Sequence, residues 1–279
     1  VPRNIKIVNA IIHEDEAYVF KVTVPTNNPK EIRPALEALL EENVPIPPSD
    51  ALFEYSILAS DQNLSETTVA VSVISKTSAL KYLDVFAQGD ISVVSLETES
   101  RAIAKTIFPK NDTGVHAVLS IAKRHSVVCI IEKGAVVFSS SIEVGDTDLT
   151  RAVAMTLNIK EDAAETMRKR DGRTDNETDI QLFEAMMPVF GTIRDELGKM
   201  LVYWKTQGKK ERHFVDISDI TLLGSGSIAP GFVEYITAAS KIPAKIGSVW
   251  TNTLSPESCL PRLHKNDSLD YGSLIGTLV

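Results

Sequence analysis

A glycine-rich segment is the part of the sequence whose residue types and spacing could do chemistry most directly. Residues 220–223 read as a buried strand, the turn Gly224-Ser-Gly-Ser227 follows, and a helix begins near Gly231. Glycines let a ligand approach the backbone closely, while N–H groups and the positive end of a helix dipole favour an anion. The segment therefore predicts that Gly224, Ser225, Gly226 and Ser227 contact a phosphate or a nucleoside. A plain connection between strand and helix is the alternative.

The elements that must position this turn alternate between strand and helix patterns. The first part of the chain predicts strands at 9–12, 17–24, 51–58, 69–74 and 91–96, with helices after Asn28, at 78–88 and at 100–108. Asn28, Pro29 and Glu31 form a capping pattern for the first of these helices. Pro34 removes a backbone donor inside that helix, so we expect either a start near Arg33 or a kink. The alternation indicates an α/β arrangement.

The second part of the chain begins with three consecutive strand patterns, at 116–121, 127–132 and 135–140. Lys133-Gly134 joins the last two, which predicts a β-meander. Predicted helices and strands then follow in the order helix 148–157, helix 161–170, long helix 180–206, strand 220–223, helix 231–240, strand 244–246 and helix 269–278. We expect Asp146 or Thr147 to cap the first of these helices.

Composition excludes some classes of protein. The 279 residues include 29 Lys and Arg against 37 Asp and Glu, a formal net charge of −8, so the chain lacks the basic surface that nucleic acid requires. Cys129 and Cys259 have neither metal-ligand spacing nor a nearby cysteine, and they predict no metal site and a reducing compartment. No apolar run is long enough to span a bilayer, and the first residues lack a signal-peptide pattern. We therefore expect a cytoplasmic protein.

The order of elements resembles an actin-like (ribonuclease-H-like) domain, whose second half has this meander, helices and glycine-rich turn. Glu41-Glu-Asn-Val-Pro-Ile-Pro47 and Phe53-Glu-Tyr55 resemble a helix end, turn and following strand of PilM-type proteins. These are the actin-like, FtsA-related components of type IV pilus assembly. The resemblance implies an α/β, two-lobed fold with a small inserted α+β subdomain. The boundaries it implies are 1–74 for the inserted subdomain, 75–112 for the remainder of the first lobe, 113–260 for the second lobe with a helical nucleotide-side subdomain at about 147–206, and 261–279 for a closing helix.

Two departures from the family pattern affect nucleotide binding. The family's N-terminal Asp-x-Gly hairpin has no counterpart here, so we expect a first lobe that is incomplete at the N-terminus, in a chain that starts with Val1. At the second phosphate turn, ATP-binding members carry Asp-x-Gly, whereas this chain has Ser120-Ile-Ala122-Lys-Arg-His125-Ser126. Magnesium prefers carboxylate oxygens, and Ser120 offers only a hydroxyl. No catalytic residue is predicted.

Basic residues in this second turn allow a different interpretation, in which the turn binds an anion without a metal. Lys123, Arg124, His125 and Ser126 could hold an anion in place of the missing carboxylate and its metal. A solvated basic turn on the surface is the alternative.

The helix predicted at 161–170 carries the remaining nucleotide candidates. Glu165 and Arg168 resemble the pair that contacts ribose and base in the actin-like superfamily. Glu165 is also well placed for a surface ion pair with Lys169, four residues later. Binding of ATP and magnesium therefore stays open, with weak or degenerate nucleotide binding as the preferred expectation.

The resemblance implies a scaffold rather than an enzyme. In the family, a PilM-type protein binds the cytoplasmic N-terminal peptide of the inner-membrane protein PilN, in a groove between the first lobe and the inserted subdomain. We therefore expect a cytoplasmic adaptor that reaches the membrane only through a partner, although the groove residues cannot be assigned from the sequence. The alternatives are an active nucleotide-dependent ATPase of the FtsA or sugar-kinase type, and a self-associating, polymer-forming actin homologue.

Overall fold

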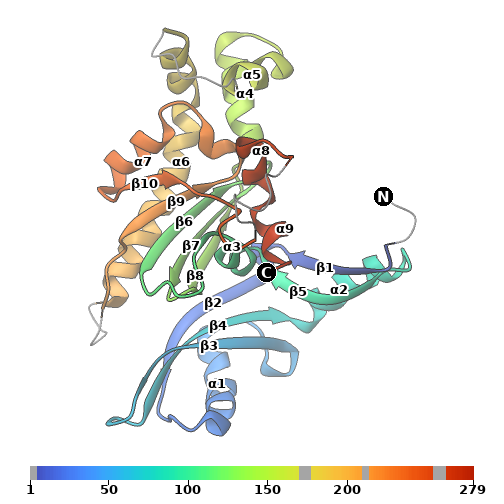
Figure 1. Cartoon of the computed structure of the whole chain (residues 1–279), viewed down its shortest axis with the longest axis vertical. Helices are drawn as coiled ribbons and strands as arrows, with labels where there is room; N and C mark the ends of the chain where they lie inside the picture. Colours follow the sequence, from blue (N-terminus) through green and yellow to red (C-terminus); the bar gives the residue numbers. More distant parts are fainter. Residues whose placement is uncertain (1–4, 170–176, 209–213, 254–261) are drawn as a thin grey trace. The chain divides into compact units, whose positions relative to one another are not determined.

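The computed structural model describes residues 5–169, 177–208, 214–253 and 262–279 (Figure 1). The chain divides into two compact units, one formed by Val1–Thr113, Cys129–Ser140 and Ser273–Val279 and the other by Gly114–Val128 and Ser141–Gly272. The predicted α/β character is confirmed, because both units combine sheets with helices.

A three-stranded antiparallel sheet and one helix form a layered part of the first unit. The sheet has the order β2-β4-β3, with β2 at Ala17–Val24, β4 at Glu66–Ser75 and β3 at Ala51–Asp61 as an edge strand. Helix α1, Pro29–Asn43, packs on one face of the sheet (Figure 1). The core between them contains Val24, Ile32, Leu36, Leu40, Phe53, Val69, Val71 and Val73. Helix α1 does not cover the opposite face of this sheet.

The start of α1 corrects one prediction. The helix begins at Pro29, and Asn28 caps it by accepting a hydrogen bond from the backbone N–H of Lys30 at 3.2 Å. A start near Arg33 is therefore wrong. Proline is well tolerated at the first helical position, and burial of the apolar face offsets the one backbone bond that Pro34 cannot make.

The first unit also contains a two-stranded parallel sheet, formed by β1, Ile7–Ile12, and β5, Ser92–Thr98. Helix α2 spans Lys76–Ala87, and α3 spans Glu99–Ile107 directly after β5. The carboxylate of Glu14 accepts hydrogen bonds from the N–H and hydroxyl of Ser100, both at 2.8 Å. This buried carboxylate therefore accepts a hydrogen bond from one of the backbone N–H groups that the first turn of α3 leaves without a helical partner.

A five-stranded sheet has the order β10-β9-β6-β7-β8. Its strands are β6 at Val115–Ile121, β7 at Ser126–Glu132, β8 at Ala135–Ile142, β9 at Asp219–Leu223 and β10 at Ala244–Ile246. Strand β9 pairs in parallel with β6 and β10. Lys133 and Gly134 have φ of 52° and 78°, the left-handed conformation of a two-residue hairpin turn, so the predicted meander is confirmed.

The remaining helices of the described residues are α4 at Asp146–Leu157, α5 at Glu161–Arg168, α6 at Glu177–Gly208, α7 at Phe232–Ser240, α8 at Lys265–Ser268 and α9 at Gly272–Gly276. Helix α4 begins at Asp146 with Gly145 as its N-cap, so the predicted cap is wrong by one or two residues. The single closing helix predicted at 269–278 is also wrong. A 3₁₀ turn at Leu269–Tyr271 separates α8 from α9, and the glycines that bound α9 disfavour a longer helix.

Candidate functional site

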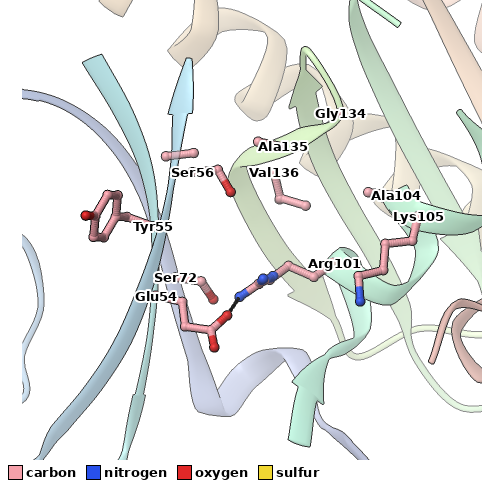
Figure 2. Close-up of a pocket in the computed structure, with 11 residues that line it drawn as sticks. Glu54, Tyr55, Ser56, Ser72, Arg101, Ala104, Lys105, Gly134, Ala135 and Val136 are labelled. Carbon is pink, nitrogen blue, oxygen red and sulfur yellow. Dashed lines mark hydrogen bonds and ion pairs between the residues drawn. The ribbon is translucent and has the colours of Figure 1, made fainter. Parts of the chain in front are cut away.

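A pocket in the first unit lies against the face of the three-stranded sheet opposite α1. Its volume is about 160 Å³, smaller than the roughly 300–1,000 Å³ typical of small-molecule sites. Its walls are β3, β4, α3, the β7–β8 turn and the start of β8, which contribute Glu54, Tyr55, Ser56, Ala70, Ser72, Arg101, Ala104, Lys105, Gly134, Ala135 and Val136 (Figure 2). A space of this size suits one or two side chains of a bound segment better than a whole nucleotide.

Strand alternation decides which side chains face the pocket. Glu54 and Ser56 point to one side of β3, and the ring of Tyr55 lies on the other side (Figure 2). In the antiparallel register Glu54 pairs with Ser72 and Ser56 with Ala70, so small side chains line this face of the sheet. Serine and alanine side chains on this face leave space for the pocket, whereas the large apolar side chains lie on the face that packs against α1.

Two cationic side chains reach the pocket from successive turns of α3. Arg101 Nη1 lies 2.6 Å from Glu54 Oε2, which is the dashed contact in Figure 2. Lys105 Nζ lies 2.5 Å from Glu97 Oε1. Because the Glu54 side chain is 73% exposed, the Arg101 pair is solvent-screened and can exchange its partner at little cost.

The β7–β8 turn is fixed to the three-stranded sheet by two lysines. Lys133 Nζ donates to the carbonyl of Leu58 at 2.8 Å, and Lys21 Nζ lies 2.8 Å from Glu132 Oε2. The side chains of Lys21 and Glu132 are only 12% and 10% exposed, so this pair is held more rigidly than Arg101 and Glu54. The β7–β8 wall of the pocket is therefore held against the sheet by the chain's own contacts.

The glycine-rich turn is packed against its own chain. Gly224 has φ of +80°, and a Cβ there would overlap the carbonyl oxygen of Ile121, at the end of β6. A Cβ on Gly226 would overlap the Ile121 side chain. Both glycines are thus required by packing, and the Ser227 hydroxyl donates to the Gly224 carbonyl at 2.7 Å. The backbone N–H of Ser225 donates to Asp270 Oδ1 at 2.6 Å.

The second predicted phosphate turn rests on the start of α4. The N–H groups of Asp146 and Thr147 donate to the carbonyls of Ala122 and Lys123, at 2.9 and 3.0 Å. The side chains of Lys123 and Arg124 are exposed, and His125 is half-buried. Ser126 is fully buried, and its hydroxyl donates to the carbonyl of Val144 at 2.6 Å. The first N–H groups of α4 are therefore used within the chain.

The predicted ribose and base contacts also have partners in the protein. Arg168 is 2% exposed, and its Nη2 lies 2.5 Å from Asp146 Oδ1 and 3.2 Å from Thr150 Oγ1. Glu165 Oε1 lies 2.6 Å from Lys169 Nζ, and this hydrogen bond lowers the pKa of Glu165. The structure brings Arg168 to the start of α4, beside the second turn, through Asp146. As ligand contacts, these residues stay predictions.

Some of this arrangement was missed by reasoning from the sequence. Asp270 lies in no recognisable motif. The only signal in the sequence is that aspartate has a carboxylate, which can accept a hydrogen bond from an N–H of the glycine-rich turn. Arg101 and Lys105 are an i, i+4 cation pair next to the predicted strand 91–96, a signal that the sequence does contain. Among the described residues, no group of three His, Cys, Asp or Glu is arranged to hold a metal ion. In the same part of the chain, no helix is both long and apolar enough to cross a membrane.

Comparison with known structures shows the fold class of this chain, which is actin-like. The structure of MreB5 of Spiroplasma citri bound to AMPPNP has a TM-score of 0.55 at 16% identity, covering 74% of this chain and 64% of that one. The ADP-bound form of MreB5 has a TM-score of 0.53 at 15% identity, covering 74% and 65%. The present chain therefore spans just under two thirds of the length of MreB5.

The family follows from the sequence match. Residues 3–272 match the family described as "Type IV pilus assembly protein PilM", and the chain belongs to this family. A solved "PilM-PilN type IV pilus biogenesis complex" has a TM-score of 0.73 at 16% identity, covering 98% of this chain and 79% of that one. The comparison with curated proteins gave no match. The predicted actin-like fold and the predicted family are both confirmed.

Proposed function

We propose that this protein is a cytoplasmic adaptor of a type IV pilus assembly platform, and that it binds the N-terminal tail of a PilN-like inner-membrane protein. The observation that carries the proposal is the pocket against the β3–β4 face, in a chain that belongs to the PilM family. A PilM structure similar over 98% of this chain is a complex with PilN, which supports a partner of that kind. The membrane is reached through this partner.

The pocket has the features that peptide capture needs. Small side chains leave room for the side chains of an extended segment. Arg101 and Lys105 can donate hydrogen bonds to carboxylate or carbonyl oxygens, and β3 is an edge strand of its sheet among the described residues. The bracing of the β7–β8 turn by Lys133 lowers the conformational cost of binding, because this wall is already ordered.

The proposal includes weak or degenerate nucleotide binding. It is supported by the absence of a carboxylate at Ser120 and by the internal partners of Arg168 and of the glycine-rich turn. An ATPase of the FtsA or sugar-kinase type is the alternative, and the similarity to the AMPPNP complex of MreB5 is what favours it. Measurement of ATP hydrolysis with magnesium separates the two, because sustained turnover by the purified chain contradicts the adaptor proposal.

Filling the pocket tests the peptide site directly. Ser56→Phe places a ring in the pocket, whereas Ser60→Phe adds the same ring to an exposed position of β3 outside it. With a fluorescent peptide of a PilN-like N-terminal tail, Ser56→Phe should weaken binding by about tenfold or more, a loss of roughly 1.4 kcal/mol. Ser60→Phe should bind like the unmodified protein. Equal binding by both variants would place the peptide elsewhere.

A further inference from the structure

An actin-like fold implies a nucleotide, but the N–H of Ser225 in the glycine-rich turn already has a partner within the chain. We propose that Asp270 is an internal ligand of the turn and closes it to phosphate-bearing ligands. Such turns bind phosphate because backbone N–H groups meet negatively charged oxygens. Here the negatively charged oxygen comes from the protein itself, 45 residues further along the chain.

The contact is a short hydrogen bond from a buried donor to the carboxylate of an exposed residue. The N–H of Ser225 donates to Asp270 Oδ1 at 2.6 Å, and Ser225 is only 6% exposed. Hydrogen bonds to ionised acceptors are shorter and stronger than neutral ones. A phosphate oxygen that used this donor would have to displace the carboxylate and leave Asp270 without its partner.

The segment that carries Asp270 is anchored on both sides. Ser268 and Leu269, directly before it, are 1% and 2% exposed. Two residues after it, a Cβ on Gly272 would lie 3.4 Å from the Val249 side chain and 3.8 Å from the Leu223 side chain, so the backbone there is in ordinary van der Waals contact with the unit. A carboxylate held in this way competes as an intramolecular ligand, at an effective concentration that a dissolved anion rarely matches.

The glycines of the turn also pack against β6. Ile121 occupies the positions that side chains on residues 224 and 226 would fill, so the glycines there serve contact with β6 and not with a ligand. Asp270 thus blocks the donor, and Ile121 takes the space beside the glycines. This reading explains the glycine-rich pattern without a bound nucleotide, and it does not depend on the peptide proposal.

The test compares Asp270→Ala with Asp267→Ala, which removes the same charge from the neighbouring exposed position on α8. ADP and inorganic pyrophosphate are titrated by calorimetry, and the Ser225 amide is followed by NMR. If Asp270 leaves the donor free in about a tenth of the molecules, its removal should tighten anion binding about tenfold. The Ser225 amide should then shift on titration, and Asp267→Ala should behave like the unmodified protein.

Three results would overturn the proposal: equally tight binding by the unmodified protein and Asp270→Ala, an equal gain in Asp267→Ala, or a gain that leaves the Ser225 amide unmoved. If Asp270→Ala does not fold, Asp270→Asn keeps an acceptor but removes the charge, and it should show a smaller gain of the same kind. Binding of the PilN-like peptide should be unchanged in all variants, so failure here is distinguishable from failure of the proposed function.

Discussion

Arg101 and Glu54 join two walls of the pocket, with Nη1 of the arginine 2.6 Å from Oε2 of the glutamate. The arginine belongs to α3 and the glutamate to the edge strand β3, so the pair crosses the pocket that we propose as the peptide site. An exposed pair of this kind contributes little to folding but presents a cation that a ligand can recruit.

Arg101→Ala should therefore separate binding from stability. We expect about tenfold weaker binding of a PilN-like peptide, and a loss of less than about 1 kcal/mol in the free energy of unfolding. Fluorescence anisotropy measures the first and urea denaturation the second. Lys81→Ala, an exposed cation on α2 outside the pocket, is the control and should change neither. A large loss of stability in Arg101→Ala would assign the residue a structural role instead.

The buried Arg168–Asp146 pair, in contrast, should contribute strongly to the free energy of unfolding. Both side chains are at least 95% buried, so Arg168→Met leaves Lys169, at 3.4 Å, as the charged partner of Asp146 among the residues that the structure describes. Breaking a buried pair typically costs about 3–5 kcal/mol, and we expect a loss in that range in urea denaturation. Glu165→Ala, which removes a solvent-exposed pair from the same helix, should cost less than about 1 kcal/mol.

Glu14 should make stability depend on pH. Burial raises the pKa of this carboxyl above its ordinary value of 4.5, although hydrogen bonds from Ser100 oppose the shift. The folded protein then holds the proton more tightly than the unfolded chain does. The stabilising contribution of Glu14 is therefore fully present below pH 4.5 and is lost as the pH rises through the raised pKa.

Glu14→Gln removes this titration. The free energy of unfolding of the unmodified protein minus that of the variant should fall as the pH increases above 4.5. Urea denaturation of both proteins across the acidic to neutral range measures this difference. A difference that stays constant or rises with pH would contradict the raised pKa.

Two glycines with positive φ allow an open turn to be compared with a packed one. Gly134 has φ of +78° with nothing within 4 Å of an added Cβ, whereas Gly224 has φ of +80° and its Cβ would overlap Ile121. Gly134→Ala should cost about 1 kcal/mol from backbone strain alone. Gly224→Ala should cost at least about 2 kcal/mol more, since β6 and the turn must move apart. Equal losses in thermal denaturation would mean that the turn is not packed on Ile121.

The sequence predicts the order of elements well because most of them have strong local patterns. The bounds of β2 and β10 are those predicted, and the meander around Lys133-Gly134 follows from turn chemistry. The resemblance in Glu41–Pro47 and Phe53–Tyr55 supplies the family, which the match over residues 3–272 confirms.

The contacts that give these elements their roles are long-range, and local patterns do not contain them. The partner of Ser225 is 45 residues away, and the pocket gathers side chains from four separate elements. An arginine at position 168 could contact either a ribose or a buried carboxylate. The sequence does not distinguish these two roles, whereas the fold shows the contact with Asp146. The position of Asp270 depends on a 3₁₀ turn that interrupts a helical pattern.

The place of β3 at the edge of its sheet has a consequence for hydrogen–deuterium exchange. Amides of β3 that point toward β4 are held in the ladder, while those on the outer edge have no strand beside them among the described residues. The outer amides should therefore exchange rapidly in the free protein. If the captured tail extends this sheet by one strand, alternate amides between Ala51 and Asp61 will become slow together, and their spacing will report the register of the bound segment.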